Sequence, residues 1–440
     1  MVNPAVGILT AIARRSGHTS SIKRVKLPVN LTRETVLPKN RHNNLFLFLL
    51  GLPSFGLTFA VTILTAFLPI ELKELTSPLF IGIIIGAEGF FGLFAPLLFG
   101  FLSDRATSVL GRFEYLVPAT AAIGSSLMLM GMIENLYVIV PMVALFYTGY
   151  FAYLAPYWAI YPDLVPDEEA SRSRSVEGIL RVVGAFFALL SGGFLLTLWE
   201  PLPFVISAGL VIGVTFSLLA TILKHSDRPI RQHVETFRES LQYLREFLAR
   251  NKDVRNLAIA NSFWNATLQS IQAFVVLFFT QGLHRSTHFV SGVIFPVAAI
   301  GILIMAPLSG RLGDRFGHVK TLTIASAIFG FGCLIAGLTQ QYWVIFVVPI
   351  VAAAATFTMI LPYATLMKLI GTDRHGAASG LFGLSRGIGS FLGPLLTGVA
   401  VVTCRGLFPS TDGYAAFWWV AGLLTIVSLF FTVRIREPQS

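Results

Sequence analysis

The sequence contains a series of long apolar blocks, and these blocks decide the class of fold. The stretch from Leu45 to Ile70 holds no charged side chain, and it exceeds the roughly 20 apolar residues that a helix needs to cross a bilayer. Similar blocks occur at 79–102, 114–133, 137–160, 176–197, 204–223, 257–280, 291–310, 319–338, 343–366, 377–402 and 414–433. Backbone polar groups in hydrocarbon must bond within the protein, and runs of this length do so as helices. The sequence therefore predicts an all-α membrane protein with twelve transmembrane helices.

Charged residues are scarce and unevenly distributed. They make up 12% of the chain, against about 25% in a soluble domain. If the N-terminus is cytoplasmic, the outside loops hold only Lys73, Arg285 and Arg405, two arginines lie within spans, and every other Lys or Arg lies inside. This positive-inside distribution predicts a multi-pass protein of the inner or plasma membrane with both termini in the cytoplasm. It also accounts for the net charge of +10 without a nucleic-acid partner.

The chain repeats itself. The segment "APLLFGFLSDR" at 95–105 returns as "APLSGRLGDR" at 306–315, in each case at the inner end of the second span of a six-span half. The segments 155–184 and 361–389 also align, with Gly178 matching Gly383 and Arg181 matching Arg386. An even number of spans per copy gives both copies the same orientation. The sequence predicts two pseudo-symmetric six-helix bundles with a seam between them.

This repeat sets the expected domain boundaries. Residues 1–43 form a basic tail and residues 435–440 a short one, both cytoplasmic, and the N-terminal tail has an organelle transit peptide as its alternative interpretation. The bundles occupy 44–223 and 257–434. Between them, 224–256 is a polar linker in which Phe237, Leu241, Leu244 and Leu248 fall at helical spacing. We expect an amphipathic helix there on the cytoplasmic surface, acting as a tether or, alternatively, as a regulatory site.

The loop segments carry a family resemblance. "GFLSDR…GR" at 100–112 and "GRLGDRFGHVK" at 310–320 resemble the cytoplasmic loop motif of the major facilitator superfamily, and the resemblance extends over essentially all spans. It implies the major facilitator fold and transport by alternating access. Within that superfamily the "SDR", spacer, "GR" and "DLVP" segments are similar to the glycoside–pentoside–hexuronide and sucrose-type cation symporters. The fourth span lacks the buried arginine common in proton-antiporting drug exporters.

The same resemblance implies a gate at the cytoplasmic side. A glycine at the end of the second and eighth spans lets a neighbouring helix approach closely. The following aspartate meets the positive N-terminus of the eleventh helix from the first copy, or of the fifth helix from the second copy, and latches the side shut. The residues expected to form this gate are Gly100, Asp104, Arg105, Arg112, Gly310, Asp314 and Arg315.

Charges within spans are expensive and indicate function. Glu88 lies ~13 Å into the second span and Arg386 ~15 Å into the eleventh at 1.5 Å per residue, so both are near the middle of the bilayer. In the resembled fold these two helices face each other across the seam. We therefore predict a Glu88–Arg386 pair that serves as a proton-coupling site, with a static ion pair as the alternative.

Arg181 has an acid on its own helix instead. Glu177 lies one turn earlier on the same face, and the eighth span opposite holds no acid. We interpret Glu177 and Arg181 as a structural pair, with participation in the gate as the alternative.

Polar and aromatic side chains follow one face of the seventh span. Amides both donate and accept hydrogen bonds, as sugar hydroxyls do, and an aromatic face packs on sugar C–H surface. The alternative is hydrogen bonding between helices, which is common for Asn and Gln in membranes. Tyrosines of the fourth and tenth spans are candidates for the same cavity. The predicted substrate-binding residues are Asn261, Trp264, Asn265, Gln269, Gln272, Tyr147, Tyr150 and Tyr363.

The sequence contains no pattern typical of an enzyme. Ser, His and Asp do not converge, no Cys and His residues have metal-ligand spacing, and there is no GxxxxGK[ST] loop. His284 and His288 are a weak pair in one outer loop. We expect no catalytic residue, no cofactor and no metal site.

The sequence thus predicts a secondary active transporter for a small polar solute, preferably a sugar or glycoside. We expect it to be a monomer driven by a proton gradient, with sodium as the alternative ion. Two other functions remain open, a proton-coupled exporter of drugs or lipids, and a non-transporting assembly factor or sensor on the same fold.

Overall fold

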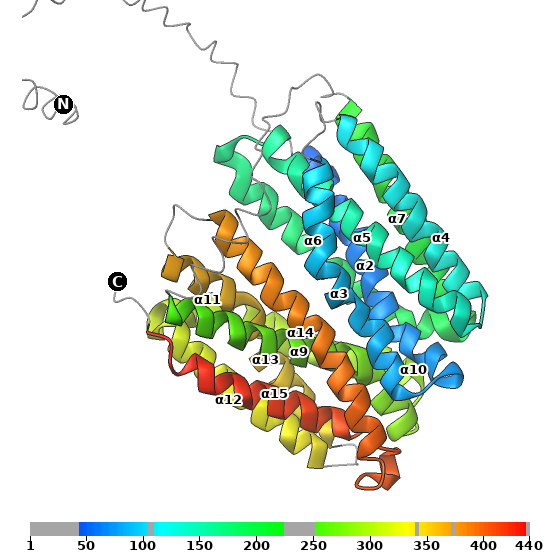
Figure 1. Ribbon diagram of the computed structural model, residues 1–440, viewed down its shortest axis with the longest axis vertical. Helices are drawn as coiled ribbons and strands as arrows, with labels where there is room; N and C mark the ends of the chain where they lie inside the picture. Colours follow the sequence, from blue (N-terminus) through cyan, green and yellow to red (C-terminus); the bar gives the residue numbers. More distant parts are fainter. Residues whose placement is uncertain (1–43, 104–109, 224–250, 339–342, 371–374, 437–440) are drawn as a thin grey trace, which may run out of the picture. The chain divides into compact units, whose positions relative to one another are not determined.

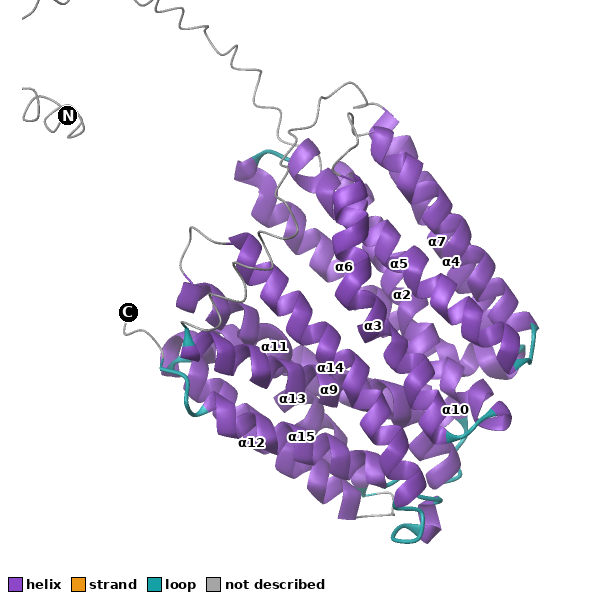
Figure 2. Ribbon diagram, viewed as in Figure 1, coloured by secondary structure: helices purple, strands orange, loops and turns teal. Residues whose placement is uncertain are grey.

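The computed structural model describes residues 44–103, 110–223, 251–338, 343–370 and 375–436. Regular structure in these ranges is entirely helical and includes no strand (Figure 2). The predicted N-terminal tail, the amphipathic stretch of the linker, Asp104 and Arg105 lie outside the described residues.

Each half of the chain supplies six long helices (Figure 1). The first half comprises α2 (Asn44–Leu75), α3 (Pro78–Ser103), the 3-10 turn η1 (Leu110–Arg112), α4 (Phe113–Met132), α5 (Leu136–Leu164), α6 (Asp167–Leu198) and α7 (Leu202–Ile222). The second half comprises α9 (Lys252–Leu277), η3 (Phe278–Gly282), α10 (Thr287–Phe289), η4 (Val290–Ile294), α11 (Phe295–Phe316), α12 (His318–Leu338), α13 (Val344–Ile370), α14 (His375–Thr403), η6 (Pro409–Thr411) and α15 (Ala416–Thr432).

These helices confirm the all-α membrane fold class. Eleven helical segments of the described chain are long and apolar enough to cross a membrane, and α15 is a shorter apolar helix of 17 residues. Several helices extend beyond the apolar blocks. For example, α6 begins at Asp167 and α9 at Lys252, so the end of the segment assigned to the linker is already helical.

The two halves pack by the same plan. In the first half α2 contacts α6 and α7, and α4 joins α5 and α7, while α3 packs on α5. In the second half α9 contacts α14 and α15, and α12 joins α13 and α15, while α11 packs on α13. Each of these five contacts in one half has its counterpart at the repeat position in the other. The duplication visible in the sequence is therefore a duplication of packing.

The halves meet mainly where α3 crosses α14. A methyl group added at Gly82 would lie 2.3 Å from the Pro394 carbonyl oxygen, and one at Gly89 would lie 2.2 Å from the Phe391 nitrogen. No side chain fits at such distances, so glycine is what permits the two backbones to touch.

The contact between the halves extends from one end of the helices to about their middle. We call that end the contact end, and it includes Gly398 of α14 beside Pro78 of α3, and Gly193 of α6 beside Thr287 of α10. The helices of the two halves converge there (Figure 1). The other end, where α3 and α11 terminate, is called the motif end. Toward it, methyl groups added at Gly100, Gly178, Gly380 and Gly383 would meet no atom within 4 Å. The halves are thus closed together at the contact end and apart at the motif end.

The crossing of α3 and α14 yields a stability prediction. Gly89→Ala adds one methyl group against backbone atoms at 2.2 and 2.4 Å, and overpacking of this kind typically costs about 1–3 kcal/mol. We expect its melting temperature in detergent to fall by several degrees. Gly209→Ala in α7 is the matched control because its added methyl meets no atom within 4 Å. An unchanged Gly89→Ala melting temperature would contradict the close approach.

Candidate functional site

The candidate site is centred on Glu88 in α3, a carboxylate within a membrane-spanning helix. Its side chain is 11% exposed. One carboxylate oxygen accepts a hydrogen bond from the Gln269 Nε2 of α9 at 2.9 Å. The other lies 3.9 Å from the Arg386 Nη2 of α14. Both partners belong to the second half, so Glu88 connects the two halves.

The helix crossing explains this arrangement. Gly89 follows Glu88, and Gly387 follows Arg386. The carbonyl oxygen of Gly387 would lie 2.4 Å from a methyl group at Gly89. Where the backbones touch at these glycines, the preceding side chains are brought within reach of one another. The structure therefore places the predicted pair together, while its role in proton coupling stays a prediction.

Two tyrosines of α5 lie beside this pair. Tyr147 is fully buried, and its hydroxyl is 3.5 Å from the Ile85 carbonyl oxygen. Tyr150 is half-buried and stacks on Phe146, with ring centroids 6.0 Å apart. Tyr147 thus belongs to the core of the first half, and Tyr150 is the more accessible of the two predicted tyrosines.

The amides of α9 hydrogen-bond to other protein groups. Asn261 is buried and donates to the Ser385 Oγ at 2.6 Å. Asn265 donates to the Asn261 carbonyl oxygen at 2.8 Å. Gln272 donates to the Thr65 Oγ1 of α2 at 2.6 Å. With Gln269 bound to Glu88, three of the four amides bond to other helices, as in the alternative interpretation of the sequence, and Asn265 bonds within α9.

The predicted aromatic partner of this stripe points elsewhere. Trp264 is fully buried in a cluster of the second half with Leu257, Leu322 and Phe357. A ring enclosed in that core presents no face to a solute, so the expectation for Trp264 is corrected. Tyr363 of α13 is 39% exposed and stands edge-on to Phe382, with ring centroids 5.3 Å apart.

The predicted Glu177–Arg181 pair is not formed. Glu177 is 6% exposed and accepts a hydrogen bond from the Ser54 Oγ of α2 at 2.8 Å. Arg181 is exposed and makes no ion pair with any residue that the structure describes. The Glu177 carboxylate points toward α2 because α6 packs closely on α2, and Ser54 of α2 supplies the hydroxyl that donates to it.

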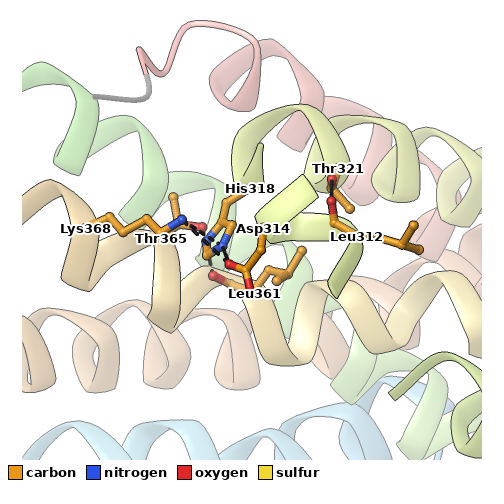
Figure 3. A network of polar contacts seen from close by, with 7 residues as sticks. All are labelled: Leu312, Asp314, His318, Thr321, Leu361, Thr365 and Lys368. Atoms are coloured by element: carbon orange, nitrogen blue, oxygen red, sulfur yellow. Dashed lines mark hydrogen bonds and ion pairs between the residues drawn. The ribbon is translucent and has the colours of Figure 1, made fainter. Parts of the chain in front are cut away.

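At the motif end, Asp314 also departs from expectation. It is 75% exposed and lies 3.1 Å from the His318 Nε2, which in turn is 3.0 Å from the Lys368 Nζ of α13 (Figure 3). All three residues belong to the second half. The predicted latch between Asp314 and the fifth helix of the first half is absent in this conformation because the halves are apart at this end. A methyl group added at Gly310 would also meet no atom within 4 Å, and the guanidinium of Arg315 lies 5.2 Å from the Phe316 ring centroid.

The first half has a corresponding tether that the sequence interpretation missed. The Arg112 Nε donates to the Asp163 Oδ2 of α5 at 2.9 Å, and its Nη1 donates to the Ser103 Oγ at 2.6 Å. The Arg112 and Asp163 side chains are only 4% and 11% exposed. The signal was available, since Asp163 is the acid of the "DLVP" turn at the inner end of the fourth block.

A second missed group closes the contact end. The Ser291 Oγ accepts from the Gly193 backbone N–H at 3.0 Å. The Thr197 Oγ1 lies 2.6 Å from the His288 Nε2. Thus α6 of the first half is fastened to the α10–η4 segment of the second by short polar contacts.

Two repeated bundles of membrane-spanning helices that meet where α3 crosses α14 have the architecture of a membrane transporter with two pseudo-symmetric halves. The chain belongs to the major facilitator superfamily, because the model of the Major Facilitator Superfamily matches residues 175–394 and 285–440.

Proteins of known name are similar to this chain over more than nine-tenths of its length. The chain is 25% identical over 420 residues to the multidrug resistance protein MdtG of Escherichia fergusonii, covering 91% of this chain and 97% of that protein. It is 24% identical to the MdtG of Klebsiella pneumoniae, covering 92% and 96%.

Solved structures show the same fold. A point mutant of the nucleoside transporter NupG superimposes with a TM-score of 0.73 at 16% identity, covering 89% of this chain and 99% of that chain. A bacterial homologue of the human lysosomal transporter Spinster, in an inward-facing and occupied conformation, gives 0.71 at 16% identity, covering 90% and 98%.

The Arg112 tether yields a second stability prediction. Asp163→Ala removes the carboxylate that pairs with a nearly buried guanidinium, and breaking a buried pair in this way typically costs about 3–5 kcal/mol. We expect a large fall in the melting temperature of the purified protein. Glu74→Ala is the control because it removes an acid that is 75% exposed and paired with Lys73, and such surface pairs contribute about 0–1 kcal/mol. Equal effects of the two substitutions would contradict a structural tether.

Proposed function

We propose that this protein is a proton-coupled exporter of small organic solutes that works by alternating access. The observation that carries the proposal is the position of Glu88. It is a carboxylate in the middle of a membrane-spanning helix of one half, and its two partners, Gln269 and Arg386, lie in the other half. A change in its protonation therefore acts directly on the contact between the halves.

The physical argument is one of differential interaction. Ionised Glu88 attracts Arg386 across the crossing of α3 and α14, and this attraction favours the conformation closed at the contact end. Protonated Glu88 loses that attraction but keeps a hydrogen bond to Gln269, because an amide both donates and accepts. Protonation thus lowers the free energy of the alternative conformation relative to this one, which is the requirement for coupling.

The direction of transport is supported by the relatives. Proteins named multidrug resistance protein MdtG match this chain over more than nine-tenths of both lengths. The argument for a sugar rested on free amides beside an indole. In the structure those amides bond to Ser385, Glu88 and Thr65, and Trp264 is buried. The site geometry therefore does not favour a sugar, and the likeness to sugar symporters stays a prediction.

The distribution of basic residues supports a cytoplasmic motif end in the plasma or inner membrane. In that orientation the conformation described here is open toward the cytoplasm, from which an exporter takes up its solute. We expect the monomer to be the working unit because each chain contains both halves of the gate.

The coupling role of Glu88 is testable with a near-isosteric substitution. In liposomes containing Glu88→Gln, we expect gradient-driven transport of organic dyes to be abolished, while exchange of the same dyes without a gradient continues. The measurement is the flux of anionic, cationic and neutral aromatic dyes and of labelled sugars, with and without an imposed proton gradient.

Glu114→Gln is the matched control, because Glu114 is an exposed acid in the first turn of α4, and we expect wild-type behaviour from it. Loss of exchange together with accumulation in Glu88→Gln would refute coupling through this residue. Gradient-driven uptake of a sugar alone would replace the exporter with a sugar symporter.

Alternating access makes a separate prediction about labelling. In a background in which Cys333 and Cys404 are replaced by Ser, we expect Gly178→Cys and Gly383→Cys to react with an impermeant maleimide added from the cytoplasmic side. Ser207→Cys in α7 should stay unlabelled because Ser207 is fully buried. Reaction only from the external side would mean that the motif end faces outward, and export would lose its structural support.

A further inference from the structure

The duplication gives each half a glycine followed three residues later by an arginine. In α6 the pair is Gly178 and Arg181, and in α14 it is Gly383 and Arg386. Methyl groups added at either glycine would meet no atom within 4 Å, and both arginines are exposed. Because residues three apart share a helix face, each guanidinium lies beside open space and not against a packed helix.

Arg181 does not face the apolar outer surface of α6. Arg174, two turns earlier on the same face, lies 4.5 Å from the Tyr161 ring centroid and donates to the Trp158 carbonyl oxygen. Both acceptors belong to α5. The exposed apolar residues Ile179 and Val182 lie on other faces of the helix. Arg181 is therefore directed toward the side of α6 that meets α5.

The carboxylates near these arginines are covered, and the guanidinium groups are not. Glu177 is 6% exposed and Glu88 8% exposed, and they accept hydrogen bonds from Ser54 and Gln269, respectively. By contrast, the Arg386 side chain is 55% exposed although it is 3.9 Å from Glu88. A solute that reaches this region thus meets the exposed guanidinium groups of Arg181 and Arg386, because the two carboxylates beside them are covered.

Tyr150 belongs to the helix between the two arginines. Helix α5 packs on α3, whose Glu88 lies 3.9 Å from Arg386, and α5 also meets α6, which carries Arg181. Tyr150 is half-buried and stacks on Phe146 with ring centroids 6.0 Å apart. One phenol and two guanidinium groups, on α5, α6 and α14, thus each have hydrogen-bond donors available in this part of the molecule.

We infer that Arg181 and Arg386, with Tyr150, form a recognition site for an anionic oxygen group of the transported solute, such as a carboxylate, sulfonate or phosphate. Guanidinium groups bind such oxygens through two parallel hydrogen bonds. This inference rests on the proposed function, because it names the class of solute that the exporter takes up.

The energetics of closure favour an anion over a neutral solute. An arginine in a membrane-spanning helix is costly unless water or a counter-charge solvates it. In the open conformation the exposure of both side chains provides water. Closing the motif end removes water from two like charges, and their repulsion then opposes closure. An anion between them removes that penalty, so the charged solute itself permits the conformational change.

Binding of matched neutral and anionic probes tests this site. The probes are naphthalene sulfonate and naphthalene sulfonamide, which have the same apolar body and differ in charge. We expect the purified full-length protein to bind the sulfonate more tightly in isothermal titration calorimetry. Arg181→Gln and Arg386→Gln should each weaken sulfonate binding by about tenfold to a hundredfold, the range for a charge-assisted hydrogen bond. Sulfonamide binding should stay unchanged, and Arg181→Lys should restore part of the loss.

Arg172→Gln is the matched control. Arg172 is an exposed arginine of the same helix that lies nine residues from Arg181, on the opposite face, and its replacement should leave both affinities as in the wild type. If sulfonate and sulfonamide bind equally to the wild type, or if the Arg181 and Arg386 variants weaken both probes equally, the site does not recognise charge and the inference is overturned.

The anionic group could belong to a soluble molecule or to a lipid headgroup. Titrations in nanodiscs of phosphatidylcholine, with and without phosphatidylglycerol, distinguish the two sources. Competition by phosphatidylglycerol that disappears in Arg181→Gln would identify the headgroup as an occupant of the same site. Sulfonate affinity independent of the lipid would identify the soluble anion.

The outcomes also separate this inference from the proposed function. Charge-selective binding with normal gradient-driven flux in Glu88→Gln would sustain the anion site and refute the coupling mechanism. Flux that depends on Glu88 but is equal for anionic and neutral dyes would sustain the transporter and refute the anion site.

Discussion

The crossing of α3 and α14 is the contact on which the rest of the candidate site depends. Gly89 and Gly387 allow two backbones to touch in the middle of a membrane-spanning region, and the residues before them, Glu88 and Arg386, are thereby brought within 3.9 Å. A larger side chain at either glycine would separate the helices and leave a carboxylate and a guanidinium apart in a poorly solvated region, which is expensive. The ion pair between Glu88 and Arg386 therefore depends on the close packing at Gly89 and Gly387.

Polar tethers inside each half explain how the halves can move as units. In the first half a basic residue of the loop region, Arg112, binds an acid of α5, Asp163. In the second half the signs are reversed, since the last turn of α11 supplies Asp314 and α13 supplies Lys368, with His318 between them (Figure 3). Both arrangements of charge connect the end of the second long helix of a half, α3 or α11, to the fourth long helix of the same half, α5 or α13. Polar contacts between the halves, by contrast, are few and short, such as Gln272 to Thr65 and Ser291 to Gly193. The structure thus concentrates change at the seam.

Much of this architecture could be predicted from the sequence, because hydrophobic length and internal repetition are properties of the chain itself. The twelve apolar blocks, the two halves and the proximity of Glu88 to Arg386 follow from length, alignment and the resembled fold. Side-chain direction does not follow in the same way. Glu177 and Arg181 have ideal spacing for a pair, yet Ser54 of α2 offers Glu177 a buried donor, and only the packing of α6 on α2 reveals it. Trp264 and Gln269 lie on the same helix, but they are five residues apart and therefore point to different sides of it. The Trp264 side faces the core of the second half. The latch expected at Asp314 belongs to a conformation in which the motif end is closed, and one sequence encodes both conformations.

The two halves differ at the centre of the molecule, where only one of two repeat-related arginines faces a carboxylate of the described chain. Duplication supplied an arginine at the same place in each half, Arg181 and Arg386, but an acid opposite only one of them. Arg386 has Glu88 across the seam, whereas Arg181 has no carboxylate partner among the described residues. Had both been paired, the centre would be two static ion pairs with little reason to change on binding. Had neither been paired, closure would place two unneutralised cations together. In the proposed mechanism the Glu88–Arg386 pair responds to a proton and Arg181 responds to an anionic ligand, and a charge bound at one site alters the electrostatic free energy at the other. In this proposal the coupling between proton and solute is the electrostatic interaction between the charges bound at the two repeat-related arginines.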